Sequence, residues 1–136
     1  MKANVYFSRA ITPEKVVALY EAAGKTLPGK VAVKVHSGEK GNQNFLHPDF
    51  WKEIIENVGG TVVECNTAYE GARNTTPKHL ALLEDHGWNR YFTVDLLDAQ
   101  GPDMVLDIPD GHKIHKNYHQ KPAVGGIRQV YCLKLL

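Results

Sequence analysis

The sequence has few cysteines and no long apolar run, and these two absences exclude several classes of protein. The cysteines are Cys65 and Cys132, which form no Cys-x-x-Cys pair. They therefore predict neither a disulfide framework nor a cysteine-bound zinc or iron–sulfur site, and the cofactor stays unknown. No apolar stretch approaches the roughly 20 residues that a membrane-spanning helix needs.

An excess of charge of one sign is also missing. The formal net charge is +1, so no strong field is expected to draw the chain to nucleic acid or to an anionic membrane. Residues 1–7 include a lysine but lack an apolar core of signal-peptide length before Ser8-Arg9. We therefore expect a cytoplasmic protein that binds neither nucleic acid nor membrane.

The residues that are present suit one folded domain. The chain has 136 residues, of which 43% are hydrophobic and 23% charged, as is ordinary for a globular protein. It contains no linker, low-complexity segment or internal repeat. We therefore predict a single α/β domain over residues 1–136.

Three segments each begin with a proline and end with a glycine. Proline opens each, at Pro13, Pro48 and Pro77, and glycine closes each, at Gly24, Gly59 and Gly87. Proline suits the first helical turn because its missing N–H would have no partner there, and glycine suits the left-handed position after the last turn. Apolar residues at helical spacing lie between them, so three amphipathic helices are predicted.

Strands are predicted between these helices, at residues 5–8, 30–36, 61–65 and 91–97. Alternation of strand and helix favours parallel pairing through right-handed crossovers. Residues 104–108 and 112–116 flank Asp110-Gly111, which predicts an antiparallel hairpin, and residues 129–136 predict a last strand. The predicted fold is therefore an open, mostly parallel sheet with flanking helices and an appended β-hairpin.

Polar residues follow three of the predicted strands, and a parallel sheet would bring them to one edge. Helix N-termini at Pro48 and Pro77 would face the same edge, where free N–H groups favour an anion. Arg73 adds a donor suited to carboxylate or phosphate. We therefore expect a crevice for a small anionic ligand, with the candidate residues Lys34, His36, Gly38, Glu39, Asn42, Asn66, Thr67, Tyr69 and Arg73.

Several of these residues leave alternatives open. Lys34 interrupts an apolar strand, and it either reaches water from an edge strand or points into the crevice as a cation or proton donor. His36 and Glu39 could bind a metal with Asp95 or Asp98, although a hydrogen-bonded loop histidine is favoured. The Gly38-x-x-Gly41 spacing matches no phosphate-binding fingerprint.

Other polar side chains are given ordinary roles. His36 and Ser37 are adjacent on a strand, so their side chains point apart and form no catalytic dyad. His112, His115 and His119 are read as mostly solvated, and Cys65 as a small core residue.

The ordered series of motifs resembles a known family. It runs from Lys34-Val35-His36-Ser37-Gly38-Glu39-Lys40-Gly41-Asn42, through Leu46, Pro48 and Gly59-Gly60, to Asn66-Thr67-x-Tyr69-x-Gly71-x-Arg73, His79 and His86-Gly87. Over roughly residues 4–119 it resembles the N-terminal half of domain-of-unknown-function family three-six-two, whose members are often labelled uncharacterised iron–sulfur centre proteins. The family's activity is not established, so the resemblance implies site residues without a role.

Longer members of that family continue into a further α/β portion, often with clustered cysteines, whereas this chain runs from Pro122 into a short tail. The resemblance therefore implies a shortened member, an incomplete catalytic site, and exposed apolar surface that homo-oligomerisation would cover. Three functions remain open: a ligand-binding half of an iron–sulfur-associated redox protein, a metal-dependent enzyme using histidine, glutamate and aspartate, and a non-catalytic assembly subunit.

Overall fold

The computed structural model describes residues 4–101, 104–107, 117–120 and 129–131. Its helices are α1 (Pro13–Ala22), α2 (Pro48–Val58), α3 (Thr76–Asp85) and the short 3-10 helix η1 (Trp88–Arg90). Its strands are β1 (Val31–Lys34), β2 (Gly60–Glu64), β3 (Asp95–Leu96), β4 (Met104–Asp107), β5 (Asn117–Gln120) and β6 (Gln129–Tyr131).

The three predicted helices are confirmed, with their caps. Pro13, Pro48 and Pro77 all lie in the first turns of α1, α2 and α3. Thr12 caps α1 by accepting a hydrogen bond from the backbone N–H of Lys15 at 3.4 Å. Gly59 ends α2 in the left-handed conformation, with φ of +60°, which glycine adopts without a steric penalty.

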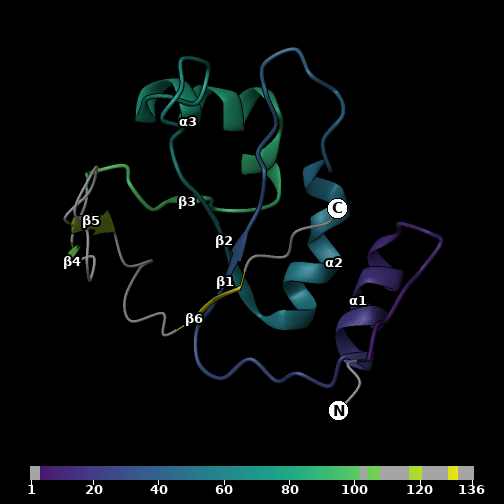
Figure 1. Cartoon of the computed structure of the whole chain (residues 1–136). Coiled ribbons are helices and arrows are strands. Elements are labelled where there is room, and N and C mark those ends of the chain that lie inside the picture. The colour runs from purple at the N-terminus through teal and green to yellow at the C-terminus, as the bar shows by residue number, and fades with distance from the viewer. Residues whose placement is uncertain (1–3, 102–103, 108–116, 121–128, 132–136) are drawn as a thin grey trace.

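The sheet is an open, parallel α/β sheet, as predicted. Its strand order is β3-β2-β1-β6, and each neighbouring pair runs parallel. Figure 1 shows α1 and α2 together on one side of this sheet and α3 beyond the carboxyl ends of β1 and β2. The polar loops that follow β1 and β2 therefore start from the same edge, next to α3.

The core follows the alternation of side chains along β1. Val31, Val33 and Val35 face α1 and α2 and pack into the main cluster with Trp51 and Trp88. Ala32 lies on the opposite face with Val63 of β2. The β1 side chains thus point alternately to two apolar layers, and Lys34 is the position where this apolar pattern ends.

Two of the predicted strands, at residues 5–8 and 91–97, differ from the structure. Residues 4–12 form neither helix nor strand, and Val5 and Phe7 are 88% and 79% exposed, so the predicted strand at 5–8 is wrong. Apolar alternation alone did not make a strand there, because a strand also needs a partner for its backbone groups. The predicted strand at 91–97 shrinks to Asp95–Leu96, because Tyr91 belongs to the turn after η1 and residues 92–94 form neither helix nor strand.

The appended hairpin is not confirmed as predicted. β4 pairs antiparallel with β5, with Val105 opposite His119, so the described partner of β4 is Asn117–Gln120 and not the predicted segment. The predicted turn at Asp110-Gly111 and the segment 112–116, with His112 and His115, lie outside the described residues. Within the described residues, no helix has the length and apolar character needed to cross a bilayer.

Candidate functional site

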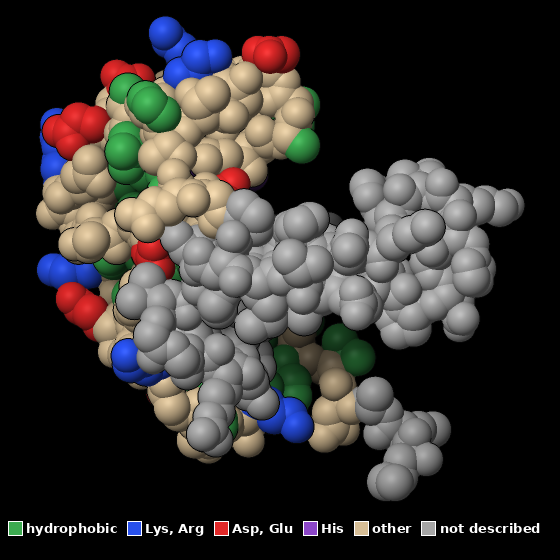
Figure 2. Space-filling model, turned by 90° about the vertical axis from the view of Figure 1, so that its left-hand side faces the viewer, with side chains coloured by type: hydrophobic (Ala, Val, Ile, Leu, Met, Phe, Trp, Pro, Cys, Tyr) green, Lys and Arg blue, Asp and Glu red, His purple; other side chains and the backbone are tan. Residues whose placement is uncertain are grey.

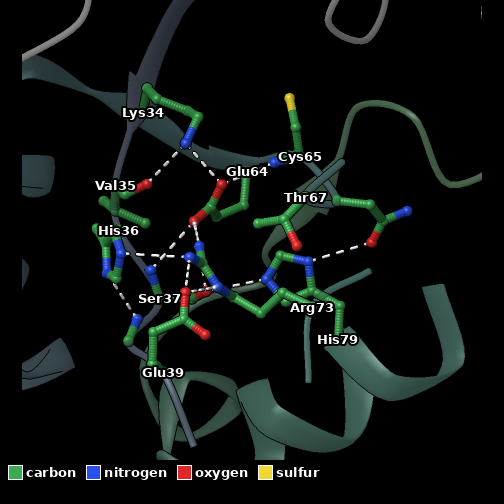
Figure 3. Close-up of polar contacts among 12 residues, drawn as sticks. Lys34, Val35, His36, Ser37, Glu39, Glu64, Cys65, Thr67, Arg73 and His79 are labelled. Carbon is green, nitrogen blue, oxygen red and sulfur yellow. Dashed lines mark hydrogen bonds and ion pairs between the residues drawn. The ribbon is translucent and has the colours of Figure 1, made fainter. Parts of the chain in front are cut away.

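The loops after β1, β2 and β3 meet at one edge of the sheet, as predicted, and we call this edge the rim. Arg73 of the second loop contacts His36 of the first, with 3.3 Å between Nη2 and Nε2. The backbone N–H of Asn66 donates to both carboxylate oxygens of Asp98, at 2.9 and 3.1 Å, which joins the second loop to the third. Figure 3 shows the His36 and Arg73 side chains turned toward one another.

Glu64, a residue that sequence reasoning did not select, is the centre of the rim. It is the last residue of β2 and is only 1% exposed. Its Oε2 accepts from Lys34 Nζ at 2.6 Å and from the backbone N–H of Cys65 at 2.8 Å. Its Oε1 accepts from Arg73 Nη1 at 3.2 Å and from the backbone N–H of Ser37 at 3.1 Å.

These contacts keep Glu64 ionised inside the protein. Burial acts to raise the pKa of its carboxyl, but the hydrogen bonds and charges of Lys34 and the backbone donors outweigh burial, and the net pKa is lowered. Lys34 is therefore the counter-ion of Glu64, with a side chain that is 31% exposed. β1 lies between β2 and β6, so Lys34 does not lie on an edge strand, and its role toward a ligand stays a prediction.

Arg73, Glu39 and Tyr69 form a second group, which we call the Arg73 cluster. One oxygen of Glu39, Oε1, accepts from Arg73 Nε at 3.1 Å, from Arg73 Nη2, and from the Tyr69 hydroxyl at 2.6 Å. The Arg73 side chain is 5% exposed, whereas that of Glu39 is 34% exposed. The hydrogen bond from Arg73, followed by that from Tyr69, lowers the pKa of Glu39.

His36 borders the Arg73 cluster and is exposed. Its Nδ1 lies 3.0 Å from the backbone N–H of Gly38, and its Nε2 lies 3.3 Å from Arg73 Nη2. A neutral imidazole has one acceptor nitrogen, so only one of these two contacts is a hydrogen bond. The choice between them depends on the position of a single proton.

Ser37, His79 and Asn66 form a buried chain of hydrogen bonds. The Thr76 hydroxyl donates to the carbonyl of Ala99 and accepts from Asn66 Nδ2. Asn66 Oδ1 then accepts from His79 Nδ1 at 3.2 Å, which leaves His79 Nε2 to accept from the Ser37 hydroxyl at 2.9 Å.

In this chain of hydrogen bonds His79 donates from Nδ1 and accepts at Nε2, so its imidazole must be neutral. Burial lowers the pKa of that imidazole, which favours the neutral form. The same direction commits the single hydroxyl hydrogen of Ser37 to His79 rather than to Glu64 Oε1, which lies 3.3 Å away.

The order serine, histidine, asparagine matches a nucleophile, its base and an orienting residue, but the surroundings of Ser37 oppose that role. Ser37 has no exposed surface. Its carbonyl accepts from Trp88 Nε1 at 3.0 Å and lies 2.9 Å from His86 Nδ1. A substrate has no path to the Ser37 hydroxyl. We therefore assign the hydrogen bonds of Ser37, His79 and Asn66 a structural role in holding the first loop against α3 and η1.

The remaining predicted residues shape the loops. Gly38 has φ of +93°, and a Cβ there would lie 2.7 Å from His86 Nδ1, so both its conformation and its surroundings require glycine. Thr67 donates from its backbone to the Arg73 carbonyl at 2.8 Å. Asn42 is exposed and accepts from the backbone of Asn44 at 2.8 Å, so it supports a local turn outside the Arg73 cluster.

The predicted metal site is not supported by these positions. Arg73 Nη2 contacts both His36 and Glu39, so a cationic side chain occupies the place between the two proposed ligands. Asp98 is engaged by the backbone of Asn66. Across the part of the chain that the structure describes, no group of three or more histidine, cysteine, aspartate or glutamate side chains is gathered to hold a metal.

Cys65 is half-buried at the end of β2, with its sulfur on the side away from Arg73 (Figure 3). Burial is the main cause that raises the pKa of its thiol. A raised pKa disfavours the reactive thiolate. Cys65 belongs to neither hydrophobic cluster, so the prediction of a core residue is not confirmed.

One face of the molecule carries both signs of charge. On the face seen in Figure 2, basic and acidic side chains of the described residues are interspersed rather than gathered into one patch. A cavity of about 530 Å³ opens beside the Arg73 cluster, between Lys40 of the first loop, Gly71 and Ala72 of the second, and Lys78 of α3.

Comparison of the chain with protein-family models found no matching family, and searches of curated proteins and of solved structures found no match. The resemblance to domain-of-unknown-function family three-six-two therefore stays a prediction.

Proposed function

We propose that the rim binds a small ligand through a carboxylate or phosphate oxygen held by Arg73 and Tyr69, at the position that Glu39 Oε1 occupies in the structure. The observation that carries this proposal is the convergence of three donor groups on that one oxygen. Donors arranged around a single anionic oxygen are what an oxyanion-binding site requires.

Glu39 has the properties of a displaceable occupant. It lies on a loop between Gly38 and Gly41, which have φ of +93° and +79°, so the backbone on both sides uses conformations that glycine adopts freely. Its side chain is one-third exposed, whereas the Arg73 side chain beneath it is buried. Glu39 can therefore leave toward solvent while Arg73 stays in place.

The charges at the rim favour a ligand that replaces Glu39 over a ligand that binds beside it. Lys34 and Arg73 carry two positive charges, and Glu64 and Glu39 carry two negative ones. A monoanionic group that replaces Glu39 keeps this balance, whereas one that binds beside Glu39 would leave an uncompensated negative charge next to buried groups. Glu39 therefore acts as an internal competitor of the ligand.

Titration with sodium propionate and with inorganic phosphate tests the proposal, followed by amide NMR shifts at low ionic strength. Glu39→Gln removes the competing charge but keeps the shape of the side chain. Hydrogen bonds to charged groups are about twice as strong as neutral ones, so we expect affinity to rise about tenfold, or about 1.4 kcal/mol. Glu53→Gln, an exposed change on α2, should leave the affinity unchanged.

Arg73→Lys should abolish binding, because a lysine cannot present the forked donors of arginine. The proposal is wrong if neither anion shifts the amides of the rim in Glu39→Gln. Self-association and the link to an iron–sulfur partner stay predictions that rest on the family resemblance alone.

A further inference from the structure

The cavity of about 530 Å³ beside the Arg73 cluster is larger than one carboxylate or phosphate group needs. Its walls come from the loop after β1, through Lys40, from the loop after β2, through Gly71 and Ala72, and from α3, through Lys78 and Asp85. Three segments that are distant in sequence therefore enclose one space next to the proposed site.

Residues of the cavity wall adjoin residues of the Arg73 cluster along the sequence, although the cluster itself does not line the cavity. Lys40 directly follows Glu39, and Ala72 directly precedes Arg73. A Cβ added to Gly71 would lie 3.9 Å from Cε2 of Tyr69, so the Tyr69 ring borders the cavity wall. The proposed anion site and the cavity are therefore neighbours along the loop after β2.

The charges in the cavity are arranged along α3. Lys78 lies in the first turn of the helix, where its Nζ donates to Asn74 Oδ1 at 3.0 Å and keeps two further N–H groups. Asp85 lies seven residues later, about 10 Å along the helix. Along α3, the basic end of the cavity is therefore the N-terminal end of the helix, and Lys40 of the first loop also lines the cavity.

One neighbouring carboxylate weakens this positive end without removing it. Glu70 accepts from Asn74 Nδ2 at 3.0 Å, so it lies beyond Asn74 as seen from Lys78. Lys40 and Lys78 are both exposed, and neither forms an ion pair among the described residues.

We propose that the ligand of the rim carries two anionic groups joined by a short chain, as in a dicarboxylate or a phosphorylated carboxylic acid. One group binds Arg73 and Tyr69, and the second lies between Lys40 and Lys78. This inference rests on the proposed function, since it needs the first group to replace Glu39. The exchange removes the negative charge of Glu39 from the same loop that carries Lys40, which strengthens the positive field on the second group.

Calorimetric titration of the whole chain with the dicarboxylates from malonate to adipate, each beside the monocarboxylate of equal length, tests this inference. We expect the best dicarboxylate to bind at least tenfold more tightly than its monocarboxylate. The double variant Lys40→Met and Lys78→Met should reduce that preference to less than twofold. Lys52→Met, which removes an exposed lysine on α2, should keep it.

The possible results separate the two proposals. If monocarboxylates and dicarboxylates bind equally to the unaltered chain, or if the double variant keeps the preference, the second anionic group is refuted and the oxyanion site stands. If neither class binds, even to Glu39→Gln, the oxyanion site fails and this inference fails with it.

Discussion

Replacing Glu64 with glutamine should destabilise the protein strongly, although the two side chains have nearly the same shape. Each carboxylate oxygen of Glu64 accepts from one charged side chain and one backbone N–H. An amide offers one acceptor oxygen, so one of these pairs of donors must face an NH₂ group. The less costly orientation turns the NH₂ toward Lys34, whose side chain is 31% exposed and can reach water.

The magnitude follows from the donors that are left. The backbone N–H of Cys65 would lose its acceptor, at a cost of about 1 to 3 kcal/mol. The charge-assisted bond from Lys34 would be lost as well, and Arg73 would keep a neutral partner in place of a buried carboxylate. Breaking a buried ion pair by removing one partner costs about 3 to 5 kcal/mol, and we expect Glu64→Gln to fall in this range.

Urea unfolding followed by tryptophan fluorescence measures this loss, because Trp51 and Trp88 are both buried. Glu53→Gln on the exposed face of α2 is the matched control and should change the free energy of unfolding by less than about 0.5 kcal/mol. Lys34→Met should cost less than Glu64→Gln, since it leaves Arg73 to neutralise Glu64. A loss below about 1 kcal/mol for Glu64→Gln at pH 7 would refute the central role given to this carboxylate.

Two further perturbations test the rim. Burial lowers the pKa of His79 from its ordinary value of 6.5, so as the pH falls below 6.5 the unfolded chain takes up a proton before the folded one, and the protein loses stability. The free energies of unfolding at pH 7 and pH 5 should therefore differ less in His79→Gln than in the unaltered protein, and equal differences would contradict this. Gly38→Ala should reduce the free energy of unfolding by about 2 to 4 kcal/mol, because of the positive φ of Gly38 and the 2.7 Å approach of a Cβ to His86. Gly41→Ala, which has a positive φ but open space around the Cβ, should reduce it by about 1 kcal/mol. Thermal melts compare the two variants, and equal losses would contradict the packing argument.

Much of the fold was predictable because it depends on local signals. Proline and glycine mark the ends of α1, α2 and α3, and these rules need no knowledge of distant contacts. The meeting of His36 with Arg73 was also predictable, since it follows from the parallel direction of β1 and β2. The failed strand at residues 5–8 had the right composition, but a strand exists only where another strand pairs with it.

The central residue of the rim was missed because burial and partners are properties of the folded chain. Glu64 lies within the predicted strand at 61–65, where a carboxylate breaks the apolar pattern of a central strand in the same way as Lys34. Two opposite charges near the ends of neighbouring strands are a signal that could have paired them. The contact of Ser37 with His79 joins residues 42 positions apart, and no local pattern predicts it.

The double hydrogen bonding of the Ser37 carbonyl has a consequence for the order in which the protein forms. Its donors, His86 and Trp88, lie 49 and 51 positions later in the chain, so the first loop cannot take its final course until the polypeptide has been made and folded through η1. Contacts of such long sequence separation are costly to close early. The rim should therefore be among the last regions to form, after α1 and α2 have packed on β1.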